Sequence, residues 1–144
     1  MFSVPESIEI RAPAESAAQI VSASRLATRK PLWAKLSPAV PDIAEVARAA
    51  QAAGADGLSL VNTIRGLKLD SRTLRPALGP GQGGLSGPAI KPLALRMVFQ
   101  VARALPGVPL MGIGGISDLS DVLEFLAAGA SAVQVSSIRR STSP

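Results

Sequence analysis

Short apolar runs alternate along the chain with segments in which apolar residues recur every three or four positions. These two periods bury one face of a strand and one face of a helix respectively. The order of runs and helical segments predicts parallel β-α-β units and an α/β fold in a single domain, 1–144. The predicted strands are 31–36, 57–61, 108–111 and 132–135, with a further strand candidate at 7–11, and the predicted helices are 13–28, 42–53, 89–105 and 118–128.

A glycine-rich turn follows the third of the long predicted strands. Gly112, Gly114 and Gly115 carry no Cβ, so backbone amides in this turn can converge on an oxyanion, most often a phosphate. Ser117 and Asp118 stand directly before the next helix, where their side-chain oxygens can accept hydrogen bonds from its free amides. The turn is therefore a candidate phosphate site.

Each predicted helix has one apolar face, and we expect that face to be buried against the sheet. The residues available for burial are Ala17, Ile20, Val21 and Leu26 in the first helix, Leu93, Leu95, Val98, Val101 and Leu105 in the third, and Val122, Leu123, Phe125 and Leu126 in the fourth.

The connection 64–84 is long and rich in glycine and proline. A loop of this length in a compact domain usually serves a site. A short hairpin with arms 67–69 and 74–78 fits its leucines. The glycines near its end, up to Gly87, either lead into the next helix or open their amides toward a cofactor, and their density favours a cofactor.

Polar residues stand where two predicted strands meet their loops. A lysine in an apolar strand, such as Lys35, either faces solvent at a sheet edge or points from the carboxyl end of the strand toward a ligand. The break at Ser37 and Pro38 directly after it favours the ligand. Asn62 and Thr63 follow the next strand, where barrel enzymes place ligand contacts, although asparagine is also common in turns.

The composition narrows the possible chemistry. Apolar residues make up 47% of the chain, enough for a core, and the absence of cysteine and histidine removes disulfides, a thiol nucleophile and the commonest metal ligands. A zinc site is therefore not expected. The net charge of +5 comes from scattered basic residues, and only 3% of residues are aromatic, so we expect binding of small anions rather than nucleic acid.

No apolar run approaches the roughly 20 residues of a membrane span, and no signal-peptide pattern is present. We therefore expect a cytoplasmic protein without membrane contact. The Ser-rich segment 138–144 is expected to be a disordered tail. Four parallel strands make about half of a barrel, and the open edges of such a sheet favour self-association into a homo-oligomer.

Five short motifs occur in and after the predicted strands: 35–38 (KLSP), 56–63 (DGLSLVNT), 83–92 (GGLSGPAIKP), 112–116 (GIGGI) and 129–135 (GASAVQV). In this order they resemble the class 1 dihydroorotate dehydrogenases, FMN-dependent enzymes of pyrimidine biosynthesis. The resemblance covers 12–137 and implies a partial TIM (β/α)8 barrel of about four C-terminal β/α units. The segment 61–63 and the following loop look most like the NAD-linked subgroup, whose barrel subunit associates with an iron–sulfur and FAD electron-transfer subunit.

The resemblance also implies a role for each matching residue. The reaction would be the oxidation of dihydroorotate to orotate with FMN as the cofactor. Asn62 and Thr63 would hydrogen-bond the pyrimidine, and Lys35 would contact the flavin ring. The residues implied to hold FMN are Lys35, the backbones of Val61 and Gly87, and Gly114, Gly115, Ser136 and Ser137, the last four through amides to its phosphate.

Two departures from the family pattern bear on activity. Ser136 and Ser137 stand where the family usually has Gly-Thr, which weakens binding if that glycine needs a positive φ or a close backbone approach. The family's catalytic base is a cysteine on a loop of the first half of the barrel, and this chain has no cysteine. No catalytic residue is therefore assigned, and we expect the isolated chain not to oxidise dihydroorotate.

Two other functions fit the same pattern. Glycine-rich phosphate loops occur in many barrels, so the chain fits another enzyme that uses FMN or a phosphorylated substrate. It also fits a catalytically inactive protein that binds a partner or a second copy of itself.

Overall fold

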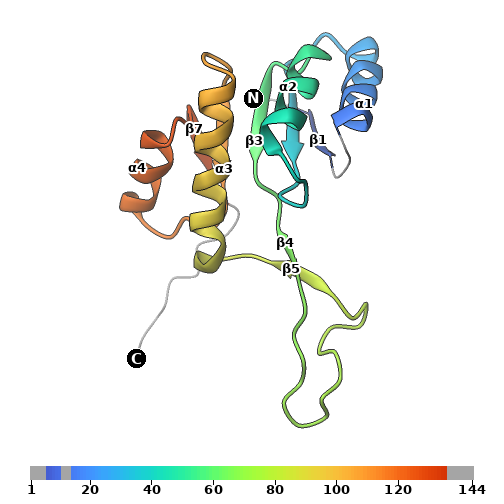
Figure 1. Ribbon diagram of the computed structural model, residues 1–144, viewed down its shortest axis with the longest axis vertical. Coiled ribbons are helices and arrows are strands. Elements are labelled where there is room, and N and C mark those ends of the chain that lie inside the picture. Colours follow the sequence, from blue (N-terminus) through green and yellow to red (C-terminus); the bar gives the residue numbers. More distant parts are fainter. Residues whose placement is uncertain (1–5, 11–13, 136–144) are drawn as a thin grey trace.

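The computed structural model describes residues 6–10 and 14–135. A parallel sheet carries a layer of helices, and a hairpin projects from one end of the molecule (Figure 1). In chain order the elements are β1 (Glu6–Ile10), α1 (Ala14–Ala27), β2 (Leu32–Leu36), α2 (Ile43–Ala52), β3 (Gly57–Leu60), β4 (Ile64–Gly66), β5 (Gly83–Leu85), the 3₁₀ helix η1 (Pro88–Ile90), α3 (Lys91–Ala104), β6 (Leu110–Ile113), α4 (Leu119–Ala127) and β7 (Ala132–Gln134).

The main sheet has the strand order β1-β2-β3-β6-β7, and every neighbouring pair is parallel. Strand order thus follows chain order, with a helix in each connection, as in consecutive units of a (β/α)8 barrel. Within the described residues β1 and β7 are the free edges, so the barrel is partial and open. The predicted fold of about four β/α units is confirmed, and the strand candidate 7–11 is present as β1.

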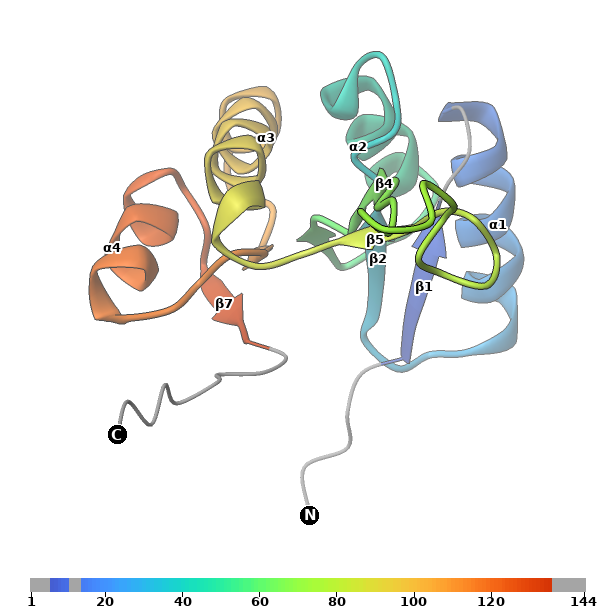
Figure 2. The same ribbon diagram turned by 90° about the horizontal axis from the view of Figure 1, so that it is seen from below.

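All four α-helices lie on the same face of the main sheet (Figure 2). In β2 the apolar residues Leu32, Ala34 and Leu36 are buried, whereas Trp33 and Lys35 between them are half-buried. Because successive strand residues point to opposite faces, Trp33 and Lys35 lie on the face away from the helices. That face is the one a complete barrel would enclose.

The helix starts show how local sequence fixes the elements. At α2, the Asp42 carboxylate accepts from the amide of Ala44 at 2.8 Å. At α4, the Asp118 carboxylate accepts from the Asp121 amide at 3.1 Å, and the Asp121 carboxylate accepts from the Asp118 amide at 3.3 Å, which is a capping box. Asp118 is a cap as predicted. Ser117 was expected to cap with its hydroxyl, but instead its backbone amide donates to Asp121 at 2.7 Å.

Fewer helix residues are buried than their apolar faces suggested. Leu93 of α3 is 43% exposed, and Leu123 of α4 is 57% exposed. Each helix packs through a narrow stripe because it covers one face of the sheet, and apolar residues beside that stripe remain outside. Predicted burial is correct for Ala17, Val21, Val98, Val101 and Phe125, and wrong for Ile20, Leu26, Leu93, Leu123 and Leu126.

The long connection forms a hairpin that projects away from the sheet and helices (Figure 1). Its paired strands, β4 and β5, lie at its base, outside the predicted arms. The predicted arms are joined to each other by a bridge between Leu69 and Pro76 and by a hydrogen bond from the Ala77 amide to the Lys68 carbonyl. At the tip, Asp70 accepts from the amides of Arg72 and Thr73 at 2.9 and 2.8 Å. Asp70 thus stabilises the turn that connects the two predicted arms.

An ion pair joins α1 to the sheet at the end where the parallel strands begin. Asp56 Oδ2 accepts from the Leu32 amide at 2.7 Å and from Arg25 Nη1 at 2.9 Å. Arg25 Nη2 also donates to the carbonyl of Lys30 at 2.5 Å. The hydrogen bond from Leu32, together with Arg25, lowers the pKa of Asp56. This cluster lies at the opposite end of the strands from their carboxyl ends.

Candidate functional site

A cavity of about 460 Å³ lies at the carboxyl ends of the main-sheet strands. Parallel strands bring the residues that follow each strand to one end of the sheet, which is where β/α barrels bind ligands. The lining comes from stretches far apart in the sequence, each placed by its own strand or helix start. The lining residues are Lys35, Val61, Asn62, Thr63, Ser86, Gly87, Pro88, Ile90, Ile113, Gly114, Gly115, Ile116, Ser117, Gln134 and Val135.

The structure brings together all the predicted site residues that it describes. Ser136 and Ser137 lie outside the described residues, directly after Val135 of the lining. The residues that share the cavity are Lys35, Val61, Asn62, Thr63, Gly87, Gly114 and Gly115.

Among the described residues that line this cavity, Lys35 is the only cationic one. It sits on β2, which pairs with β1 on one side and with β3 on the other, so it is not on an edge strand of the described sheet. Its partner in the neighbouring strand β3 is Ser59, which is buried. Lys35 therefore lines the cavity from a strand that is paired on both sides. The alternative that this lysine faces solvent at a sheet edge is wrong.

Asn62 and Thr63 stand between two cavities. They line the first, and they also line a second of about 730 Å³ under the base of the hairpin, beside Ser37 and Arg65. The backbone amide of Asn62 donates to the Leu36 carbonyl at 3.1 Å, which fixes the backbone where the strand ends. The hairpin packs closely on this point, since a Cβ at Gly84 would overlap the Thr63 side chain. Their polar side chains thus lie where the hairpin meets the main cavity.

The glycine turn after β6 packs against the loop before α3. Gly115 has a φ of +75°, and a Cβ on it would lie 2.8 Å from the Gly87 carbonyl oxygen and 2.9 Å from the Lys91 amide nitrogen. Gly114 likewise abuts Ile90. Any side chain at Gly115 would push the two loops apart, so glycine here permits the two backbones that line the cavity to meet.

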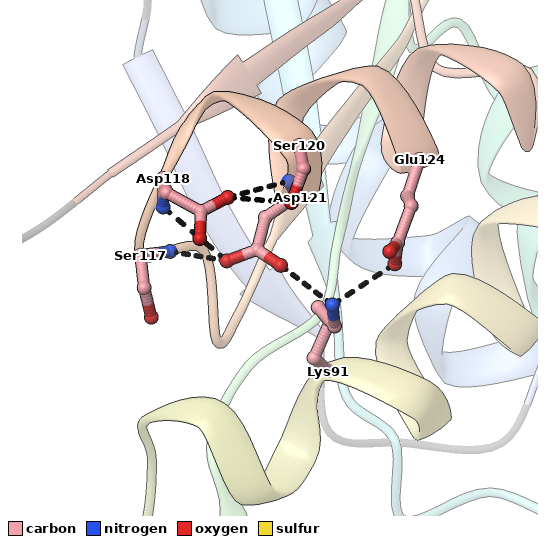
Figure 3. Close-up of polar contacts among 6 residues, drawn as sticks. All are labelled: Lys91, Ser117, Asp118, Ser120, Asp121 and Glu124. Carbon is pink, nitrogen blue, oxygen red and sulfur yellow. Dashed lines mark hydrogen bonds and ion pairs between the residues drawn. The ribbon is translucent and has the colours of Figure 1, made fainter.

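A cluster of charges beside this contact ties α3 to α4 (Figure 3). Lys91 Nζ lies 2.5 Å from Asp121 Oδ1 and 3.0 Å from Glu124 Oε2. Asp121 is buried, and its other oxygen accepts from the amides of Ser117 and Asp118. The cluster thus connects the start of α3, the turn after β6 and the first turns of α4.

The pKa values in this cluster are shifted in the directions that such contacts produce. The hydrogen bond from Lys91, followed by that from the Ser117 amide, lowers the pKa of Asp121. Hydrogen bonds to Asp121 and Glu124 raise the pKa of Lys91. Both shifts favour the charged forms, so Asp121 and Lys91 are ionised at neutral pH.

Sequence reasoning missed the Lys91 cluster and part of the lining. Lys91 belongs to the motif 83–92, but its partner Asp121 lies 30 residues further on and reads only as a helix-capping carboxylate. Gln134 also lines the cavity, but the apolar residues around it drew no attention to it. Its position was a possible signal. Successive strand residues point to opposite faces, so a residue next to Val133, which packs against the core, faces away from that core.

The fold and the cavity together define a partial (β/α)8 barrel with a glycine-lined cavity at the carboxyl ends of its strands. A model of the dihydroorotate dehydrogenase family matches residues 3–142. The chain belongs to the dihydroorotate dehydrogenase family.

Individual relatives agree with this family assignment. The chain is 58% identical over 119 residues to the proteins named dihydroorotate dehydrogenase B (NAD(+)), catalytic subunit, of Pelobacter propionicus and Trichlorobacter lovleyi, covering 83% of this chain in each case. It is 54% identical over 118 residues to the putative dihydroorotate dehydrogenase A (fumarate) of Solibacter usitatus, covering 82% of this chain. The matches span only 38–39% of the length of these relatives.

None of the helices in the described part of the chain is long and apolar enough to cross a membrane.

Proposed function

We propose that this chain forms part of the FMN and substrate site of a dihydroorotate dehydrogenase that oxidises dihydroorotate to orotate in pyrimidine biosynthesis. One observation carries the proposal: seven residues matched to the family's motifs, from four separate stretches, line a single cavity. Membership of the family and the names of its relatives support the same reaction.

The residues of the cavity fit the parts of FMN. Gly114 and Gly115 both have positive φ, a conformation that glycine adopts without strain and in which a turn can direct its backbone amides toward a phosphate. We assign the phosphate to these amides and to Ser136 and Ser137. The backbones of Val61 and Gly87 would lie along the cofactor. When bound, FMN supplies the hydride acceptor for the oxidation.

Lys35 provides the charge that the flavin ring needs. A cation beside the ring stabilises the negative charge that develops on reduction, and strand β2, which is paired on both sides, carries the Lys35 side chain that lines the cavity. Asn62 and Thr63 offer amide and hydroxyl groups that can pair with the polar edge of a pyrimidine. Together they would orient the substrate between the hairpin base and the cofactor.

The proton that leaves the substrate needs a base, and we assign none within this chain. The chain has neither cysteine nor histidine. We therefore propose that it binds cofactor and substrate but does not by itself turn over dihydroorotate. We further propose that its partner is an iron–sulfur and FAD electron-transfer subunit, as the relatives named NAD(+)-linked catalytic subunits suggest. Self-association and a cytoplasmic location remain predictions.

Binding of FMN by the purified chain, followed through the quenching of flavin fluorescence, tests this proposal. We expect saturable quenching that Lys35→Met weakens, whereas the matched variant Lys68→Met, which removes a lysine of the projecting hairpin, leaves it unchanged. Quenching that is absent, or that both variants weaken equally, would contradict the assignment of Lys35 to the cofactor.

A further inference from the structure

The Lys91 cluster lies directly behind the glycine turn that we assign to phosphate, yet Lys91 is not among the residues that line the cavity. Its ammonium group is held between Asp121 and Glu124 on α4. Its own backbone amide lies against Gly115. The lysine therefore contacts the turn from behind through its backbone and its side chain faces the neighbouring helix.

The Asp121 carboxylate determines which amides remain for an anion. One of its oxygens accepts from the amides of Ser117 and Asp118 at 2.7 and 3.3 Å, so the carboxylate already occupies the amides at the start of α4. An anion in the cavity is left with amides earlier in the turn. The carboxylate also fixes the direction in which the turn enters the helix, because both hydrogen bonds end on one oxygen of a buried residue.

We propose that Lys91 and Asp121 are positioning residues that hold the turn 114–117 in the geometry that binds a phosphate group, and that Lys91 does not contact the phosphate. The inference rests on the proposed FMN site. Lys91 anchors Asp121 from α3, and Asp121 anchors Ser117. The ion pair thereby keeps the two loops that meet at Gly115 in a fixed position relative to each other. The backbone amides of the turn are then already oriented before the ligand binds.

The alternative role for Lys91 is that of a phosphate ligand that leaves its carboxylates when the ligand binds. The two roles predict opposite effects of Asp121→Ala. If Lys91 binds the phosphate directly, this variant frees its side chain, and the loss of a nearby negative charge strengthens the binding of FMN. If Lys91 and Asp121 instead position the turn, this variant breaks the pair, and FMN binding weakens although the protein gains net positive charge.

The first experiment compares FMN with riboflavin, which has the same ring and no phosphate, by fluorescence titration. We expect Asp121→Ala and Lys91→Met to weaken FMN binding by at least roughly tenfold, as for the loss of a charge-assisted hydrogen bond, and to leave riboflavin binding unchanged. Lys91→Arg, which keeps the cation, should restore most of the affinity. Tighter FMN binding by Asp121→Ala would overturn the inference, as would an equal loss for both flavins.

A matched control exists at the other end of the sheet. Asp56 also pairs with a cation and also accepts from a backbone amide, that of Leu32. Asp56→Ala should leave the binding of FMN and of riboflavin unchanged. A loss of FMN binding in this control equal to that of Asp121→Ala would show that the effect is a general loss of folding and would overturn the positioning role.

The second experiment needs no ligand, so it decides whether Lys91 and Asp121 hold the turn even where FMN does not bind and the proposed function itself fails. Amide hydrogen exchange is measured residue by residue in the full chain. We expect Lys91→Met to speed exchange of the Ser117 and Asp118 amides by about tenfold or more, with the Leu32 amide unchanged. Exchange of Ser117 at the rate of the unsubstituted chain would show that the lysine does not hold the turn.

Discussion

Replacing Gly115 with alanine tests whether the two loops behind the cavity meet as closely as the structure shows. The new Cβ would lie 2.8 Å from the Gly87 carbonyl oxygen and 2.8 Å from the Lys91 Cβ. Two of the crowded atoms belong to backbone, the carbonyl of Gly87 and the amide of Lys91, so the clash cannot be relieved by rotation of a flexible side chain. The loops themselves must separate.

The expected cost has two parts. An alanine held at the φ of +75° seen for Gly115 loses roughly 1 kcal/mol to backbone strain. Overpacking against fixed neighbours adds roughly 1–3 kcal/mol. Gly107→Ala supplies the control, because Gly107 has a similar φ of +86° with nothing within 4 Å of its Cβ position, so it carries the strain alone.

The free energy of unfolding can be measured by urea denaturation, followed through the fluorescence of Trp33, the single tryptophan. We expect Gly115→Ala to be less stable than Gly107→Ala by roughly 1–3 kcal/mol, which is the overpacking contribution alone. Gly115→Ala should also bind FMN more weakly than Gly107→Ala does. Equal stability of the two variants would refute the close approach of the loops, and with it the geometry assigned to the phosphate site.

Three further outcomes follow from the packing and the charges. Phe125→Ala removes a fully buried ring and should lower the free energy of unfolding by about 3–5 kcal/mol. Leu119→Ala, at a position 72% exposed, should change it by less than about 0.5 kcal/mol. Similar urea midpoints for the two variants would contradict the packing of α4. Because the pKa of Asp121 is lowered by Lys91 in the folded chain, the stability it contributes is complete above its ordinary value of 3.8 and is lost as the pH falls through the lower folded value. The urea midpoint should therefore fall less steeply with acid in Asp121→Asn than in the unsubstituted chain, and parallel pH profiles would argue against the pairing. Asp56→Ala should lower the free energy of unfolding by about 1 kcal/mol, mainly because the Leu32 amide loses its acceptor, since the ion pair with Arg25 is half-exposed and weak. The loss should persist in high salt, and a loss abolished by salt would assign it to the ion pair instead.

The parts of the fold that the sequence predicted are those set by local chemistry. The break at Ser37 and Pro38 placed Lys35 at the carboxyl end of β2, and Asp118 marked the start of α4 because a carboxylate satisfies free amides there. The candidate site was predictable for a related reason. Parallel strands carry the residues that follow them to one end of the sheet, so short motifs far apart in sequence could be expected to meet.

What the sequence did not predict depends on contacts between distant elements. The pairing of Lys91 with Asp121 depends on how α3 packs beside α4, which no local pattern records. The exposure of Leu123 has the same origin, because the width of the buried stripe is set by neighbouring elements and not by the apolar face of the helix itself. The predicted hairpin arms 67–69 and 74–78 do pair, through the bridge between Leu69 and Pro76, but the pairing of β4 with β5 at the base joins segments about 20 residues apart and was not predicted.

The visible absorption spectrum of FMN in the presence of the purified chain, followed as orotate is added, tests the central claim most directly. We predict a flavin spectrum that differs from that of free FMN and shifts further with orotate, and we predict that Asn62→Ala removes only the shift caused by orotate. A spectrum identical to that of free FMN and unchanged by orotate would contradict the assignment of this cavity to flavin and pyrimidine.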